Sequence, residues 1–86
     1  MNQSHITKDT IVKFVLEKVA LRTKKAISDL HGDTQLADVG VDSLNAVLIC
    51  GYLEDEYELE IEPMMMFQHK TANQVAAAIY AMLQER

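Results

Sequence analysis

The stretch DSLNAVLICGYLEDEY, residues 42–57, predicts a helix with two apolar faces, and the rest of the fold is interpreted around it. Asp42 is a favourable N-cap residue, so the helix is expected to begin at Ser43 and to continue to about Tyr57. Each residue turns a helix by about 100°, which brings one set of apolar side chains onto a face that can pack against a core. This core face consists of Ala46, Ile49, Leu53 and Tyr57, with Cys50 at its edge.

A second apolar face lies beside Ser43, and we call it the outer face. A helix that is apolar all round is either fully buried or binds something through its second face. Full burial is difficult in a chain of 86 residues, which buries only about 60–65% of its unfolded surface. Gly51 either keeps this face flat for a partner, permits close packing of a connecting loop, or has no functional cause. The outer face consists of Leu44, Val47, Leu48 and Gly51.

A helix and a long connection are predicted before residue 42. The helix is expected from about Lys8 to about Arg22, with Thr7 as its N-cap. Its apolar residues recur at the helical spacing and are Val12, Val15, Leu16 and Val19. The connection over residues 23–41 is expected to be pinned to the core, because loops of this length are otherwise uncommon. Its apolar anchors are Ile27, Leu30, Leu36 and Val39.

One short helix and one long helix are predicted after residue 57. ELEIE, residues 58–62, alternates like a strand but has no partner strand. Pro63 suits the first turn of a short helix over PMMMF, and Thr71 with Gln74 forms a capping box for the last helix. The expected fold is an all-α bundle of three main helices and one short helix, in a single domain over residues 1–86. The buried stripe of the last helix is Ala72, Val75, Ala76, Ile79, Tyr80 and Leu83.

Composition excludes several classes of protein. The formal net charge of −5 argues against nucleic-acid binding and suits partners with basic patches. Cys50 is the only cysteine, so no intrachain disulfide can form, and we expect a small buried hydrophobic residue there. The chain shows no bilayer-spanning run and no signal-peptide pattern. We therefore expect a soluble, cytoplasmic protein with no membrane partner.

Ser43 is not expected to be a catalytic nucleophile. A serine hydroxyl needs an adjacent base that is itself oriented by a third group, and His5, His31 and His69 are scattered. The histidines and the single cysteine also lack metal-ligand spacing, so no metal site is expected. A serine at a helix N-terminus can be modified, since free backbone N–H groups there favour an attached phosphate. By this physics alone, a serine beside an N-cap is most often just a helix start.

GVDSL, residues 40–44, resembles the phosphopantetheine-attachment motif G-x-D-S-L of the acyl carrier proteins. The likeness extends over nearly the whole chain, through VGVDSLNAV and the order of the predicted helices. EIEPMMMFQHKTANQVAAAI, residues 60–79, is similar to the short third helix of this family and to its F-x-H-P-T entry into the fourth. Lys70 stands where proline is common in that pattern.

The resemblance implies a carrier function rather than an enzyme. Ser43 would accept 4′-phosphopantetheine from coenzyme A through a separate phosphopantetheinyl transferase, and Asp42 would cap the helix and sit at the metal-assisted site of that transferase. The thiol of the arm would hold acyl groups as thioesters for acyl-loading, ketosynthase or acyltransferase-type enzymes. The chain is expected to act as a monomer.

The same resemblance implies that the outer face is read by partner enzymes. Fatty-acid carriers usually place acidic residues early in this helix, whereas this chain has Asn45 and Leu48 there. Its acidic residues lie lower in the helix, at Glu54, Asp55 and Glu56. Recognition would therefore depend more on apolar contact than on charge. FQHKT and the modest net charge are more similar to carriers of polyketide or related specialised pathways than to fatty-acid carriers.

Three alternatives stay open. A peptidyl or aryl carrier is one, although such carriers more often show G-G-[HD]-S, and Val41 argues against it. An unmodified, carrier-like helical adaptor is another. The methionines at 64–66 either line a groove for the acyl chain or form ordinary core with one exposed side chain.

Overall fold

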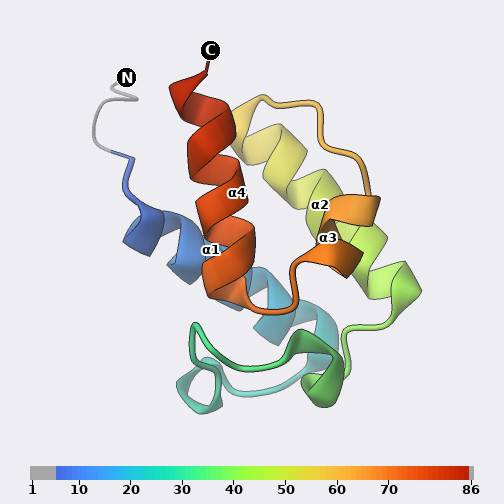
Figure 1. Cartoon of the computed structure of the whole chain (residues 1–86). Helices are drawn as coiled ribbons and strands as arrows, with labels where there is room; N and C mark the ends of the chain where they lie inside the picture. The colour runs from blue at the N-terminus through green and yellow to red at the C-terminus, as the bar shows by residue number, and fades with distance from the viewer. Residues whose placement is uncertain (1–5, 86) are drawn as a thin grey trace.

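The computed structural model describes residues 6–85, which form an all-α bundle, as the sequence predicted. No strand occurs within these residues, ELEIE included. Figure 1 shows α1 crossing behind α4 and α2 lying to the right of α4. The short α3 lies between α4 and α2 in this view. The elements in chain order are α1 (Lys8–Thr23), the 3₁₀ turns η2 (Ile27–Asp29) and η3 (Leu36–Val39), α2 (Ser43–Tyr57), α3 (Met64–Gln68) and α4 (Ala72–Gln84).

The helix α1 begins where the sequence placed it, because Thr7 and Thr10 close a reciprocal capping box. It ends at Lys24, which adopts the left-handed conformation at φ 62°. Val12 was expected in the core but is only half-buried, and Ile11 is fully buried in its place. The apolar stripe of α1 is wide enough to include both residues, and α4 packs along this helix.

The core lies where α1, α2 and α4 meet. All five residues predicted for the core face of α2 are buried, and the Tyr57 ring packs edge-on against Phe14 of α1 at a centroid distance of 5.7 Å. In α4, Tyr80 and Leu83 are only half-buried, because the stripe reaches the rim of the bundle. No helix in the described range is long and apolar enough to cross a bilayer. The buried residues of α4 are Ala72, Val75, Ala76 and Ile79.

The connection between α1 and α2 is pinned to the core, as expected. Leu30 and Leu36 are buried and Val39 is half-buried. Ile27 was expected to be an anchor, but 45% of it is exposed, because the η2 turn leaves it in an open groove beside α1. The two 3₁₀ turns give this connection more regular structure than its sequence predicted.

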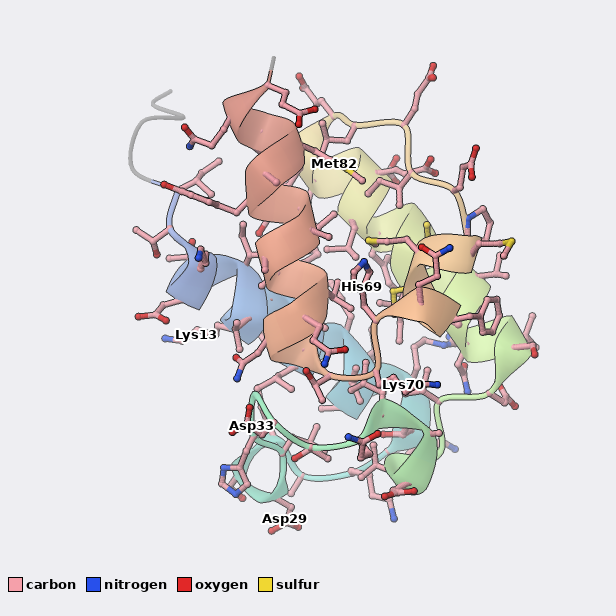
Figure 2. The ribbon with its side chains drawn as sticks, viewed as in Figure 1. Lys13, Asp29, Asp33, His69, Lys70 and Met82 are labelled. Carbon is pink, nitrogen blue, oxygen red and sulfur yellow. The ribbon has the colours of Figure 1, made fainter. Side chains whose placement is uncertain are left out.

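Hydrogen bonds tie the same connection to the start of α4. The Leu36 N–H donates to the Lys70 carbonyl at 2.9 Å, and the Asn73 N–H donates to the Gly32 carbonyl at 3.0 Å. The Asn73 side-chain amide donates to the Asp33 carboxylate at 2.7 Å. Figure 2 shows Asp33 beneath the N-terminal end of α4. The long connection is therefore held by backbone groups as well as by buried side chains.

The cap of α4 differs in one detail from the predicted capping box. The Thr71 hydroxyl accepts a hydrogen bond from the Gln74 N–H at 3.2 Å, as expected. The Gln74 side chain, however, accepts from the Lys70 N–H at 2.7 Å rather than from that of Thr71. A proline at position 70 would have no N–H to satisfy, so Gln74 supplies the partner that Lys70 requires.

A matched pair of glycine substitutions tests the contact between the loop and α4. A Cβ at position 32 would overlap the Asn73 amide, whereas a Cβ at position 51 would meet open space. We expect Gly32→Ala to lower the free energy of unfolding by about 1 kcal/mol, since it displaces the Asn73–Asp33 hydrogen bond. Gly51→Ala should raise it by up to about 1 kcal/mol, as expected for a helical glycine where an added Cβ meets no other atom. Urea denaturation measures both, and a neutral Gly32→Ala would contradict this account.

Stability at alkaline pH should depend on Tyr57. Burial, with repulsion from Glu56 and then Glu17, raises the pKa of Tyr57 from 10.0 to about 12. As the pH rises, the unfolded chain therefore loses the Tyr57 hydroxyl proton before the folded chain does. The contribution of Tyr57 to the free energy of unfolding is complete below about pH 10 and is lost as the pH rises towards about 12. We expect Tyr57→Phe to reduce this loss by about 2 kcal/mol, measured by urea denaturation across that pH range. An unchanged pH profile in the variant would contradict the assignment.

Candidate functional site

The turn before α2 determines where Ser43 lies. Gly40 has φ 103°, a conformation that side chains with a Cβ rarely adopt, and its N–H donates to the Ala37 carbonyl at 3.3 Å. Val41 then donates to the Leu36 carbonyl at 3.1 Å. Asp42 is the N-cap of α2, and its carboxylate accepts a hydrogen bond from the Asn45 N–H at 2.9 Å. Ser43 is consequently the first residue of the helix.

The Ser43 side chain is exposed and makes no hydrogen bond with the described residues. His31 is exposed in the loop between α1 and α2, His69 lies in the α3–α4 connection, and His5 lies outside the described residues. No cluster of three metal-ligating side chains occurs within residues 6–85. Within residues 6–85 no side chain hydrogen-bonds to the Ser43 hydroxyl, so this group is accessible to a reaction in which another protein supplies the catalytic groups.

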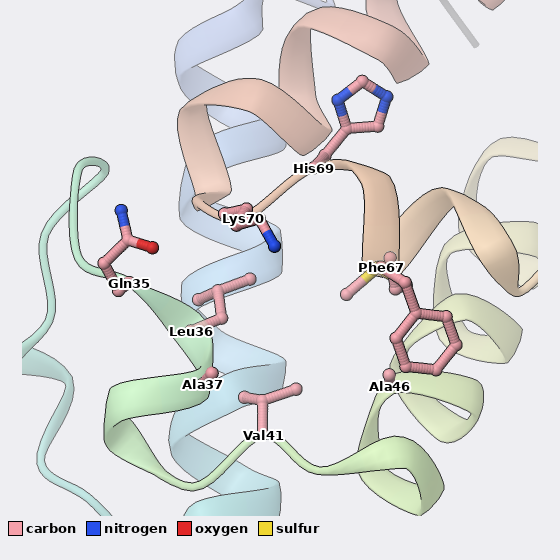
Figure 3. A pocket seen from close by; sticks show the side chains of 9 residues that line it. Gln35, Leu36, Ala37, Val41, Ala46, Phe67, His69 and Lys70 are labelled. Carbon is pink, nitrogen blue, oxygen red and sulfur yellow. The ribbon is translucent and has the colours of Figure 1, made fainter.

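A cleft opens beside the start of α2, between η3 and α3, and we call it the Ser43 cleft for its place in the fold, although Ser43 does not line it. Val41 and Ala46, which flank Ser43 in the chain, both line it. Figure 3 shows the Phe67 side chain extending from α3 to a position beside Ala46, while the His69 ring points away from Val41. The lining combines apolar and polar side chains, and it consists of Gln35, Leu36, Ala37, Val41, Ala46, Met66, Phe67, His69 and Lys70.

The outer face of α2 is exposed, as predicted. Leu44 is 66% exposed, Val47 45% and Leu48 36%. A Cβ at Gly51 would meet no atom within 4 Å, so close packing of a loop does not explain this glycine. The open space at Gly51 leaves room for a partner to approach the outer face.

The short helix α3 adds two apolar side chains that the sequence analysis did not assign to the site. Met64 is 58% exposed and Phe67 is 46% exposed. We call these two residues and the outer face together the docking surface. Their spacing of three residues places them on one side of a helix, but a helix of five residues is too short for its buried side to be predicted from sequence.

The methionine run is divided between the core and the surface. Met65 and Met66 are buried, and Met64 is exposed. This matches the interpretation as ordinary core with one exposed methionine, although Met66 also lines the Ser43 cleft.

Asn45 and Glu54 are already engaged within the fold. The Arg22 side chain of α1 donates through Nε to the Asn45 side-chain oxygen at 3.1 Å, which links the end of α1 to the start of α2. The Glu54 carboxylate accepts a hydrogen bond from the Ile61 N–H at 2.8 Å and is half-buried, whereas Asp55 is exposed. Of the two acidic residues predicted for recognition, Asp55 is therefore the more accessible.

Cys50 is a buried, protonated thiol. It is 2% exposed, and its Sγ lies 3.5 Å from the Ile61 carbonyl oxygen. Burial raises the pKa of the Cys50 thiol, and the neighbouring Glu54 carboxylate raises it further. The interpretation as a small buried residue rather than a reactive one is confirmed.

Comparison with known proteins gives a family match over most of the chain. The family described as "Phosphopantetheine attachment site" matches residues 13–79. The non-reducing polyketide synthase PKS16 of Cladonia grayi is 29% identical over 79 residues, which are 90% of this chain and 4% of that protein. The conidial pigment polyketide synthase PfmaE of Pestalotiopsis fici is 33% identical over 66 residues, which are 77% of this chain and 3% of that protein. The chain thus spans a very small part of the curated relatives it matches.

A solved structure agrees with the fold. It is a free-standing peptidyl carrier protein from an uncharacterized secondary metabolic pathway of Acinetobacter baumannii, with a TM-score of 0.85 and 27% sequence identity. The match covers 90% of this chain and 96% of that protein.

Proposed function

The chain belongs to the phosphopantetheine-attachment family, and from this premise we propose that Ser43 is the residue that carries the 4′-phosphopantetheine arm. The family is one of carriers rather than enzymes, and its arm is covalently attached. The observation that supports Ser43 is its position: it is an exposed serine at the first residue of a capped helix, with a hydroxyl that has no partner among the described residues.

The residues around Ser43 suit the transfer of the arm from coenzyme A. In that reaction a phosphoester bond forms at Ser43 Oγ as a phosphorus–oxygen bond of the coenzyme A pyrophosphate breaks. Adenosine 3′,5′-bisphosphate leaves with the electron pair of that bond, and the transferase takes up the serine proton. Asp42 caps α2 and meets the transferase at its metal-assisted site. The N-terminal end of α2 then stabilises the attached phosphate through its free N–H groups and its dipole. When bound, the arm supplies a terminal thiol that holds an acyl group as a thioester.

The polyketide class of cargo is supported by the relatives, which are polyketide synthases. A peptidyl carrier is the second candidate, because a solved structure that matches 90% of the chain is a peptidyl carrier protein. The two are separated by loading: a polyketide carrier receives acyl groups from an acyltransferase or ketosynthase, whereas a peptidyl carrier is loaded by an adenylating enzyme.

The docking surface is the proposed contact with partner enzymes. It combines exposed apolar side chains on α2 and α3, and the acidic end of α2 adjoins it, with Asp55 exposed. A partner with an apolar recess flanked by basic side chains complements this surface in shape and charge. Residues 1–86 are proposed to act as a single carrier domain and as a monomer in these encounters.

Intact mass tests the attachment directly. After incubation with coenzyme A and a broad-specificity phosphopantetheinyl transferase, the protein should gain the mass of one arm, and Ser43→Ala should gain none. A gain that survives Ser43→Ala would overturn the assignment to Ser43. No gain in the unsubstituted protein would favour the unmodified adaptor.

A charge substitution tests the docking surface. Leu48→Glu should change the free energy of unfolding by less than about 1 kcal/mol, because the side chain is already 36% exposed. It should lower the acyl-transfer kcat/KM with the partner enzyme by roughly tenfold or more, since it places a charge within an apolar contact. Ile27→Glu is the matched control, because Ile27 is 45% exposed but lies in the groove beside α1. Equal losses in both variants, or unfolding of Leu48→Glu, would contradict the assignment.

A further inference from the structure

The segment between α2 and α3 is held at one residue, Ile61, through both of its backbone polar groups. Ile61 donates its N–H to the Glu54 carboxylate at 2.8 Å, and its carbonyl oxygen faces the Cys50 thiol at 3.5 Å. Both hydrogen bonds join a side chain of α2 to the backbone of the segment between α2 and α3. The Ile61 side chain is itself buried, at 5% exposed.

The two groups that hold Ile61 come from one side of α2. Cys50 and Glu54 are four residues apart, a spacing that places side chains one above the other on a helix. One supplies a donor and the other an acceptor, so together they match both polar groups of the Ile61 residue. The raised pKa of the Cys50 thiol keeps its proton in place at neutral pH, which is the state that donates.

Glu54 also organises the end of α2 through its backbone. Its carbonyl oxygen accepts hydrogen bonds from the N–H groups of Glu58 and Leu59, the latter at 3.3 Å. Glu58 adopts the left-handed conformation at φ 55°, which turns the chain back along α2. Glu54 therefore accepts the last hydrogen bonds of the helix with its backbone carbonyl and binds the returning chain at Ile61 with its side chain.

The helix α3 depends on this attachment because it is weak by itself. It has five residues, and its N-cap Pro63 makes no side-chain hydrogen bond. A helix this short has no intrinsic stability in water. Its position is set by the burial of Met65 and Met66 and by the segment that delivers it, which is fixed at Ile61.

We propose that Cys50 and Glu54 are positioning residues, which fix Ile61 against α2 and thereby set the position of α3 over the Ser43 cleft. α3 contributes Met66 and Phe67 to that cleft and Met64 and Phe67 to the docking surface. The effect on partner enzymes rests on the proposed function, whereas the position of α3 does not. Glu54 is thus assigned a role through the acceptor oxygen of its side chain rather than through a charge displayed to partners.

Hydrogen exchange in the apo protein tests the position of α3. The N–H groups of Met65, Met66 and His69 donate to the Glu62, Pro63 and Met65 carbonyls and report on this helix. Glu54→Ala should accelerate their exchange by roughly tenfold, with a smaller change in α1 and α4. Glu54→Gln retains an acceptor for the Ile61 N–H and should restore most of the protection, and the exposed Asp55→Asn should have no effect. Unchanged exchange in Glu54→Ala, or an equal increase throughout the bundle, would overturn the proposal.

Two further variants test the thiol. Cys50→Ala removes the donor and should accelerate exchange in α3 by less than Glu54→Ala does, because a thiol is a weak donor. Cys50→Ser retains a donor and should restore protection in α3 relative to Cys50→Ala. Protection in α3 that is no greater in Cys50→Ser than in Cys50→Ala would remove Cys50 from the proposal.

Kinetics with a partner enzyme separate positioning from charge recognition. For the arm-bearing carrier, Glu54→Ala should raise the KM for acyl transfer roughly tenfold with little change in kcat, and Glu54→Gln should return the KM to within about threefold. If Glu54→Gln is as impaired as Glu54→Ala, the partner reads the charge and the positioning role in recognition is overturned. Failure of Ser43 to accept an arm would defeat the proposed function but leave the exchange results intact.

Discussion

The cap at the start of α2, where the Asp42 carboxylate accepts a hydrogen bond from the Asn45 N–H, determines the rest of the arrangement. It fixes the first residue of the helix, and the helical repeat then assigns every later side chain to a face. The core face is buried and meets α1 through the Tyr57–Phe14 ring contact, and the outer face remains exposed. Ser43 lies at the exposed beginning of that helix, where backbone N–H groups are free to meet a phosphate.

The carrier role explains why the site contains so little chemistry. Ser43, the proposed attachment residue, has no hydrogen-bond partner among the described residues. Around it, Gly40 turns the chain, Asp42 caps the helix and Val41 lines the neighbouring cleft. A protein that passes its cargo between enzymes has to offer an accessible attachment point and a readable surface. The rest of the chain keeps that surface in place through contacts remote from Ser43, such as the bonds between the long loop and the start of α4.

Much of the fold was predictable because it depends on local rules. The bounds of α2, the caps at Thr7, Asp42 and Thr71, and the core face of α2 follow from side chains a few residues apart. The errors occur where tertiary contacts decide. Val12 and Ile27 are apolar and suitably spaced, yet neither is buried. Elements distant in the chain decide which edge of α1 is covered and which turn of the loop points inward.

By itself, the sequence determined the class of fold, the capped start of α2, the exposed serine and the apolar outer face, because periodicity and capping act within a few residues. Only the tertiary structure decided that α3 adds Met64 and Phe67 to that surface and that Glu54 holds Ile61. The reason is that a five-residue helix has no orientation of its own. Its exposed side is set by the packing of Met65 and Met66 and by a hydrogen bond between residues seven positions apart, and no local pattern encodes either.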